Sequence, residues 1–262
     1  LKPAPWIPRG FVQATLPSMI PYWRLSGYYF FYFAFIGAFS PYFSLYLQSI
    51  GNTATQIAVL MSLMSVMRML APALWGWLAD RLGARTTILR LSALLSLIGF
   101  AGFLVSDAYG TLFASMAFLA FFWSAALPLV ETLTFAHLQG QAGRYGNIRV
   151  WGSVGFIVAV LGLGYLLDDL PVAALLWISL ALLGGILFCA LMIPEARASS
   201  VPDVHVALTE ILRRPHVRAL LAACFFMSAA HGALYVFYSL HLVAHGYSKS
   251  LVCWMSTSRV GA

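Results

Sequence analysis

Hydrophobic residues run through the chain in long blocks, separated by short breaks that contain polar residues or glycine. A helix needs about 20 mostly apolar residues to cross the ~30 Å hydrocarbon core of a bilayer. Seven blocks meet this length: Ser26–Gln48, Thr55–Ala79, Thr86–Ser106, Thr111–His137, Gly143–Leu167, Val172–Ile193 and Val217–Val243. An eighth block begins near Tyr247, but between there and Ala262, the last residue of the sequence, it is too short to cross a membrane. Because the blocks are continuous and do not alternate with period two, they predict an all-α membrane protein and exclude a membrane β-barrel.

The connections between the blocks predict how the helices are grouped. Most connections are short, so we expect successive helices to be antiparallel neighbours. The polar and charged stretch 194–216 is the exception, and we interpret it as a linker between two bundles. The predicted organisation is a cytoplasmic leader over 1–25, a six-helix bundle over 26–193, this linker, and the truncated start of a second bundle over 217–262.

Composition excludes a soluble fold, and the charges predict an orientation. Hydrophobic residues make up 61% of the chain and charged residues 9%, against about 25% charged in soluble domains. The net charge of +7 comes from one side of the predicted membrane, so it does not indicate nucleic acid. The loops and helix ends of that side hold Lys2, Arg9, Arg24, Arg81, Arg85, Arg90, Arg144, Arg149, Arg197, Arg213, Arg214 and Arg218. The positive-inside rule therefore predicts a cytoplasmic N-terminus and linker.

Ionisable residues inside the predicted spans are candidates for function, because each costs several kcal/mol in lipid. Arg68 lies at the midplane of the second span, where it either bonds backbone carbonyls in packing or contacts a substrate. Glu131 and Arg149 reach similar depths in consecutive helices, where they either pair or anchor the interface. His231, with Tyr235 one turn on, is either a packing residue or a proton site.

The connection between the second and third spans carries a second candidate functional motif, which would control conformational change. It contains Gly76, Asp80, Arg81, Gly83 and Arg85. Gly83 can end a helix, and Asp80 can pair with a neighbouring arginine and lock two helix ends in one state; the alternative is a helix stop with interface anchors. Motifs of enzymes, including metal-ligand clusters, Walker loops and G-x-S-x-G, are missing from the sequence. We therefore expect neither catalysis nor a metal or cofactor.

Two motifs resemble those of the major facilitator superfamily. The segment Gly76–Arg85 resembles the G-x-x-x-D-R/K-x-G-R-R loop between helices 2 and 3, with Ala84 as the departure. Pro128–Glu131 together with Tyr145–Phe156 is similar to the oligosaccharide/proton symporters of the lactose permease type. The similarity is greater to the phenylpropionate permease branch, where Y-G-x-[VI]-R-x-W-G-S opens helix 5. The resemblance covers about 28–246.

The resemblance implies twelve helices in two six-helix halves that rock around a midplane site. In the sugar-transporting members a glutamate and an arginine hold the substrate at the positions of Glu131 and Arg149. Phe156 stands where those members usually have a tryptophan that stacks on the sugar. Phe156 and Arg68 therefore favour an aromatic or other organic anion. Most of the second half, where the sugar members keep their proton-coupling residues, is missing, so we expect no transport by this fragment alone.

The sequence predicts a secondary transporter that takes up a small organic solute with protons by alternating access. An aromatic carboxylate such as phenylpropionate is favoured over a sugar or nucleoside. We expect a monomer in the lipid bilayer of a bacterial inner membrane. The alternatives are an efflux permease of the same fold and a membrane sensor that does not transport.

Overall fold

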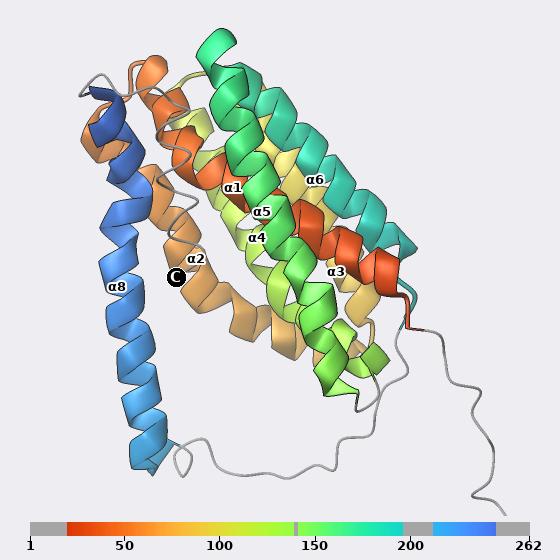
Figure 1. The fold of residues 1–262 in the computed structure, drawn as a ribbon. Coiled ribbons are helices and arrows are strands. Elements are labelled where there is room, and N and C mark those ends of the chain that lie inside the picture. Colours follow the sequence, from red (N-terminus) through yellow and green to blue (C-terminus); the bar gives the residue numbers. More distant parts are fainter. Residues whose placement is uncertain (1–19, 139–140, 196–211, 245–262) are drawn as a thin grey trace, which may run out of the picture.

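The computed structural model describes residues 20–138, 141–195 and 212–244, and all regular elements in these ranges are helical (Figure 1). The α-helices are α1 (Tyr22–Ser49), α2 (Ala54–Leu82), α3 (Arg85–Ala101), α4 (Tyr109–Leu138), α5 (Tyr145–Asp169), α6 (Ala174–Met192) and α8 (Pro215–Ala244). Two 3₁₀ turns, η1 (Gly102–Leu104) and η2 (Ala142–Arg144), precede α4 and α5. The first six α-helices, α3 together with η1, are long and apolar enough to cross a membrane. They confirm six predicted spans, and α8 covers the seventh.

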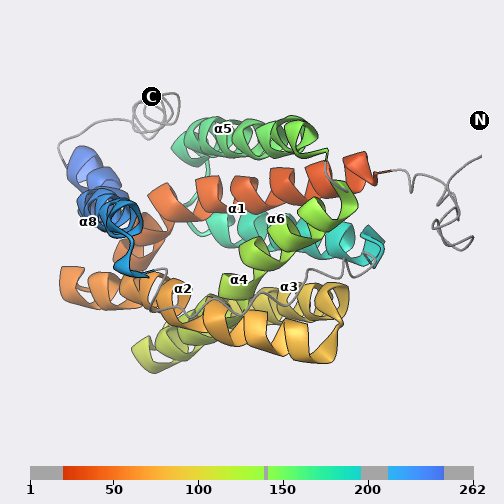
Figure 2. The same cartoon turned by 90° about the horizontal axis from the view of Figure 1, so that it is seen from below.

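Helix α1 forms the centre of the bundle. Figure 2 shows α1 between α5 on one side and α4 and α6 on the other. It carries a stripe of buried aromatic residues, with Tyr28, Tyr32, Phe35, Phe39 and Tyr46 each at most 4% exposed. Aromatic rings bury large apolar areas and stack on one another, and α1 supplies more residues to the core than any other described helix.

The helices pair differently from the order of the chain. The extensive contacts are α1 with α5 and α6, α2 with α4, and α3 with α4 and α6. Helices α1 and α2, α2 and α3, α4 and α5, and α5 and α6 make few contacts. The expectation that successive helices are neighbours is therefore wrong, apart from α3 and α4. Short loops join helix ends, but the surfaces that fit together decide which helices pack along their lengths.

The pairing has an internal symmetry. Exchanging α1, α2 and α3 with α4, α5 and α6 leaves the set of extensive contacts unchanged. Proline is the twentieth residue of both α1, as Pro41, and α4, as Pro128. Nested three-helix repeats of this kind occur within the halves of major facilitator transporters.

Two glycines allow α1 and α5 to approach closely. A Cβ added at Gly37 on α1 would lie 2.8 Å from the backbone oxygen of Phe156 on α5. A Cβ added at Gly155 on α5 would lie 2.8 Å from the carbonyl carbon of Phe30 on α1. Small residues let membrane helices pack backbone against backbone, so these glycines fix α5 against the central helix.

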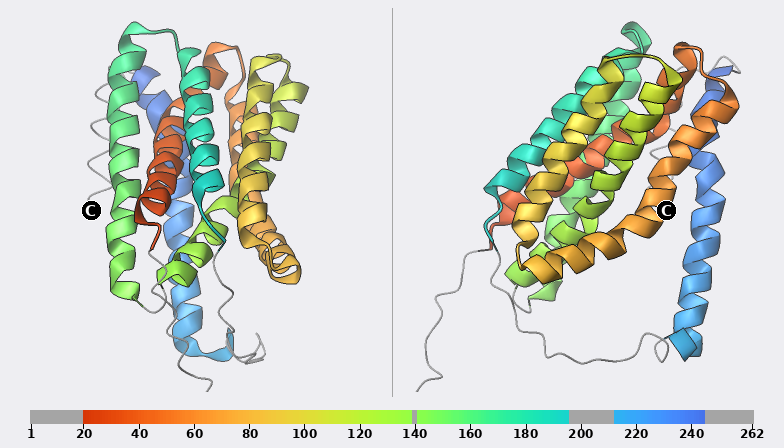
Figure 3. Two further views of the ribbon diagram at one scale, coloured as in Figure 1. Left: turned by 90° about the vertical axis from the view of Figure 1, so that its right-hand side faces the viewer. Right: turned by 180° about the vertical axis from the view of Figure 1, so that it is seen from behind.

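Helix α2 is at the edge of the bundle and is bent, as the right-hand view of Figure 3 shows. Thr53 opens it with a capping box, in which the Thr53 side chain bonds the Gln56 amide and the Gln56 side chain bonds the Thr53 amide. Pro72 lies within the helix and removes the amide hydrogen that would bond the Arg68 carbonyl. Proline is a usual cause of helix kinks, and this one lies one turn after Arg68.

Candidate functional site

A cavity opens where α1, α2, α4 and α5 converge. It consists of two adjoining pockets of about 340 and 310 Å³. The pockets share Phe33, Ile36, Met64, Arg68 and Trp123. We call the first the arginine pocket, because Arg68 and Arg149 both line it, and the second the aromatic pocket.

The arginine pocket is completed by Tyr32, Pro72, Ala120, Ser124, Leu127 and Pro128. The aromatic pocket is completed by Phe35, Phe39, Ser40, Met61, Ser65 and Phe156. Together they form a mostly apolar hollow with a few polar groups, which is typical of small-molecule sites. Arg68 from α2, and Arg149 and Phe156 from α5, are three candidates that the fold thus brings to one cavity.

The guanidinium of Arg149 is held by aromatic rings of α1. It lies 4.0 Å from the ring centroid of Phe33 and 5.4 Å from that of Tyr29, within the range of cation–π attraction. Gly152, one turn further along α5, leaves room for this arrangement, because a Cβ there would lie 2.7 Å from the Phe33 ring and 2.9 Å from an Arg149 nitrogen. The Arg-x-x-Gly spacing of α5 therefore serves a specific packing contact.

Glu131 lies near this cavity but does not pair with Arg149. Within the described part of the chain no ion pair joins the two side chains, and Glu131 instead accepts a hydrogen bond of 3.3 Å from the Tyr145 hydroxyl. Glu131 is half-buried and lines neither pocket. The predicted direct pair is not formed in this conformation, because α5 packs on α1 rather than on α4.

The structure adds Trp123, which the sequence reasoning missed. Its ring stacks on Tyr32 at 4.5 Å with an interplanar angle of 2°, and tilts against Phe35 at 4.6 Å. A signal existed in the sequence: Trp123 precedes Glu131 by about two helical turns and so falls near its face of α4. His231 and Tyr235 are residues of α8, but the structure does not describe their side chains.

The loop between α2 and α3 forms the ion pair that its sequence predicted. Arg85 donates to Asp80 at 2.8 Å, and the side chains are 36% and 67% exposed. Gly83 ends α2 in the left-handed region, at a φ of 61°, where glycine is at no disadvantage. Arg81 lies 5.3 Å from the ring centroid of Trp77. Gly76 has no neighbour that a Cβ would meet, so no packing contact in this structure requires a glycine there.

The same end of the bundle is tied to the end of α6. Arg90 donates to the carbonyls of Ala190, Leu191 and Ile193 at 2.8 to 3.2 Å. Arg24 donates to the Met192 carbonyl at 3.1 Å. The last carbonyls of a helix lack intrahelical partners and carry partial negative charge. Two arginines from α1 and α3 therefore cap α6, a role that sequence reasoning did not assign to them.

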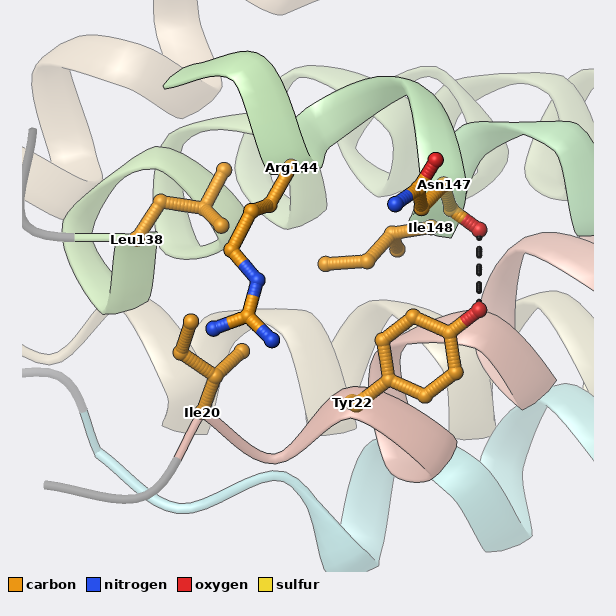
Figure 4. Close-up of a pocket in the computed structure, with 6 residues that line it drawn as sticks. All are labelled: Ile20, Tyr22, Leu138, Arg144, Asn147 and Ile148. Atoms are coloured by element: carbon orange, nitrogen blue, oxygen red, sulfur yellow. Dashed lines mark hydrogen bonds between the residues drawn. The ribbon is translucent and has the colours of Figure 1, made fainter. Parts of the chain in front are cut away.

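A third pocket of about 510 Å³ lies apart from the cavity, where α1 and α5 begin and α4 ends. Figure 4 shows the Arg144 side chain extending toward Ile20, with Leu138 on one side and Ile148 on the other. The Tyr22 hydroxyl donates to the Asn147 carbonyl at 3.1 Å. Arg144 is exposed and donates a hydrogen bond of 3.2 Å to Gln141. A substitution of Arg144 can therefore serve as the control for substitutions of the cavity arginines. Among the described residues, no group of three or more His, Cys, Asp or Glu side chains could hold a metal.

Comparisons with known proteins agree with this architecture. The model of the MFS_1 like family matches residues 22–262. Maltose permease of Geobacillus stearothermophilus is 33% identical over 75% of this chain and 48% of its own length. The probable 3-phenylpropionic acid transporter of Escherichia coli is 28% identical over 89% of this chain and 62% of its own length. The chain thus spans roughly half the length of these relatives.

The fold is also similar to that of a solved transporter. The D323A mutant of the nucleoside transporter NupG aligns with a TM-score of 0.65 and 20% identity, over 78% of this chain and 52% of that one. The family match is consistent with the six apolar helices and with the loop between α2 and α3. The chain belongs to the MFS_1 like family and is the N-terminal portion of a major facilitator transporter.

Proposed function

We propose that the complete protein takes up a small organic anion, with an aromatic carboxylate as the favoured substrate. The observation that carries the proposal is that Arg68 and Arg149 line one pocket whose remaining walls are mostly apolar and aromatic. Arginine forms planar, bidentate contacts with carboxylates. The aromatic pocket beside it suits a ring.

The charge balance of the cavity supports an anionic rather than a neutral ligand. No acidic side chain is among the described residues that line either pocket. Two cations in a low-dielectric site without a counter-charge are costly, and a bound carboxylate offsets that cost. A sugar would need many hydrogen-bonding groups, whereas Ser40, Ser65 and Ser124 are the hydroxyls of the lining apart from Tyr32. The relative named as a probable 3-phenylpropionic acid transporter is consistent with this choice.

Alternating access gives the loop between α2 and α3 its proposed role. The Asp80–Arg85 pair and the Arg90 cap join the ends of α2, α3 and α6 on one side of the bundle. Breaking and remaking such contacts can bias two conformations without touching the ligand. In our proposal His231 and Tyr235 on α8 complete the cavity from the second half.

We further propose a cytoplasmic N-terminus in a bacterial inner membrane, a monomer, and coupling to protons. The orientation rests on the basic residues, since Arg85, Arg144 and Arg213 all fall on the proposed cytoplasmic side. Proton coupling rests on the similarity to symporters. Efflux by the same fold and ligand sensing without transport are the rival outcomes of the test.

The test measures ligand affinity with purified full-length protein. We expect 3-phenylpropionate to bind and maltose not to bind. Arg68→Gln and Arg149→Gln should each weaken the binding of 3-phenylpropionate at least tenfold, whereas Arg144→Gln, outside the cavity, should leave it unchanged. Binding of maltose but not of the carboxylate would overturn the anion proposal and favour a sugar.

Direction and coupling are then measured in proteoliposomes. We expect a pH gradient, acid outside, to drive accumulation of radiolabelled 3-phenylpropionate, and a protonophore to abolish it. Export under the same gradient would establish the efflux alternative. Binding without flux in either direction would establish a sensor.

A further inference from the structure

Tyr32 on α1 brings an unbonded hydroxyl to the arginine pocket. Its side chain is 3% exposed and forms part of the wall of this pocket. Among the described residues, the side-chain atoms that are both unbonded and sealed from solvent are Ser26 Oγ, Tyr28 Oη, Ser44 Oγ, Thr86 Oγ1, Ser96 Oγ, Trp123 Nε1 and Ser179 Oγ. The Tyr32 oxygen bonds no described residue and is not one of these sealed atoms. The small accessible area of Tyr32 therefore includes its hydroxyl, which a ligand in the pocket can reach.

The other tyrosines of α1 show that an open hydroxyl is unusual in this helix. Most of them form hydrogen bonds within the protein, namely Tyr22, Tyr29, Tyr42 and Tyr46. Tyr28, one turn before Tyr32, is also unbonded, but it is fully buried and its oxygen is sealed. Buried polar groups are nearly always bonded. The open hydroxyl of Tyr32 thus calls for a partner that the described part of the protein does not supply.

The other uncharged polar groups of the arginine pocket do not offer a donor to a ligand. The Ser124 hydroxyl already donates to the Phe121 carbonyl at 2.7 Å. The Trp123 indole nitrogen is sealed from solvent. Among the described residues that line this pocket, Tyr32 is therefore the uncharged side chain whose donor is free and accessible.

Aromatic contacts fix the position of the Tyr32 hydroxyl. The Tyr32 ring stacks on Trp123 at 4.5 Å with an interplanar angle of 2°, and it meets Phe33 edge to face at 5.1 Å. Phe33 is also the ring against which the Arg149 guanidinium lies. Because the phenol oxygen lies in the plane of its ring, the contacts that hold the ring also hold the oxygen. A donor positioned before the ligand arrives is what a preorganised binding site requires.

The Tyr32 hydroxyl also lies close to the charges of the cavity. The positive charges of Arg68 and Arg149 act on it, as does the negative charge of Glu131. Since Coulomb interactions weaken with distance, a carboxylate held by the two arginines would lie beside this hydroxyl. Glu131 does not take up the Tyr32 donor, because it accepts its hydrogen bond from Tyr145 and lines neither pocket.

We infer that Tyr32 is a specificity-determining residue whose hydroxyl donates a hydrogen bond to the carboxylate of the substrate. An ionised carboxylate has about four acceptor positions, so contacts with Arg68 and Arg149 leave room for a third donor. Hydrogen bonds to ionised acceptors are stronger than those to neutral ones. Tyr32 therefore favours an aryl carboxylate over a neutral analogue of the same shape, an inference that rests on the proposed function.

The experiment compares 3-phenylpropionate with 3-phenylpropanamide, its neutral amide of nearly the same shape. Both ligands offer a carbonyl oxygen to Tyr32, but the carboxylate is charged. A hydrogen bond to a charged group corresponds to about a 10- to 150-fold gain in affinity, and one to a neutral group to about a 2- to 10-fold gain. Tyr32→Phe keeps the stacked ring and removes the hydroxyl. It should bind 3-phenylpropionate at least about tenfold more weakly and lower the carboxylate-to-amide affinity ratio by about fivefold or more.

Tyr28→Phe is the matched control. It also removes an unbonded tyrosine hydroxyl from α1, but this oxygen is sealed and Tyr28 lines neither pocket. The affinity for 3-phenylpropionate and the carboxylate-to-amide ratio should both remain as in wild type. Each ratio is internal to one protein preparation, so a variant that folds less efficiently does not distort it.

The outcomes separate this inference from the proposed function. If Arg68→Gln weakens the binding of 3-phenylpropionate but Tyr32→Phe does not, the role of Tyr32 is refuted while anion binding stands. An equal loss of affinity for both ligands in Tyr32→Phe, with the ratio unchanged, would likewise reduce Tyr32 to a structural role. If 3-phenylpropionate does not bind to the wild-type protein, the proposed function itself is wrong.

Discussion

Gly155→Ala tests whether the contact between α1 and α5 holds the site together. The added Cβ would lie 2.8 Å from the carbonyl carbon of Phe30 and 3.0 Å from its Cα. Carbon atoms in favourable contact are about 3.5–4.0 Å apart, and the Phe30 backbone oxygen lies closer still to the added Cβ, so α5 must move away from α1 by more than about 0.7 Å. The obstacle is backbone and cannot rotate aside.

The expected magnitude follows from two opposing effects. Overpacking of this kind typically costs about 1–3 kcal/mol, while replacing glycine by alanine within a helix contributes up to about 1 kcal/mol in favour of folding. Gly162→Ala is the matched control, because Gly162 lies on the same helix and a Cβ there meets nothing within 4 Å. Both variants gain the helix propensity, so their difference isolates the clash.

The assay is the free energy of unfolding of the full-length protein, measured by SDS titration in mixed micelles, together with affinity for 3-phenylpropionate. Gly162→Ala should equal or exceed the wild type in stability. Gly155→Ala should fall below Gly162→Ala by about 1–3 kcal/mol and should bind more weakly, because α5 carries Arg149 and Phe156 to the cavity. Equal stability of the two variants would refute the close backbone contact.

Three further predictions concern the loop, the topology and the site. Asp80→Asn removes an exposed ion pair with Arg85 worth no more than about 1 kcal/mol, so transport rate should drop while ligand affinity and insertion persist; a large loss of affinity would contradict a gating role. A single cysteine at Asp107 should react with an impermeant thiol reagent from the periplasm, and one at Arg85 only after the membrane is permeabilised; the reverse pattern would invert the topology. Arg149→Lys should reduce anion affinity, because lysine lacks the planar fork held 4.0 Å from the centroid of Phe33; normal binding would make this arginine an interface anchor.

A further prediction concerns the contact of Glu131, whose partner in this conformation is Tyr145 rather than Arg149. We expect a double-mutant cycle between Glu131→Gln and Tyr145→Phe to show coupling, and a protein with both Glu131 and Arg149 neutralised to bind ligand more weakly than the wild type. The measurements are insertion and ligand affinity of the full-length protein. Normal binding by the doubly neutralised protein would exclude both residues from the site.

The sequence by itself determined the helices and the charged positions that matter. Hydropathy is a local property, so blocks such as Thr55–Ala79 were recognisable without knowing what packs against them; the structure places α2 over Ala54–Leu82. The predicted end of the third span, Ser106, lies beyond the observed helix, because α3 ends at Ala101 and continues only as a 3₁₀ turn to Leu104. Arg68 was identifiable because a charge within an apolar span is costly whatever its partner.

Tertiary structure alone decided which side chains meet. Loop lengths suggested that α4 and α5 pack together, yet the surfaces around Gly37 and Gly155 bring α5 onto α1. That choice places the Arg149 guanidinium against Phe33 and leaves Glu131 with Tyr145. The physical reason is that close backbone packing depends on two complementary faces from distant parts of the chain, and neither face shows in the hydropathy of one helix.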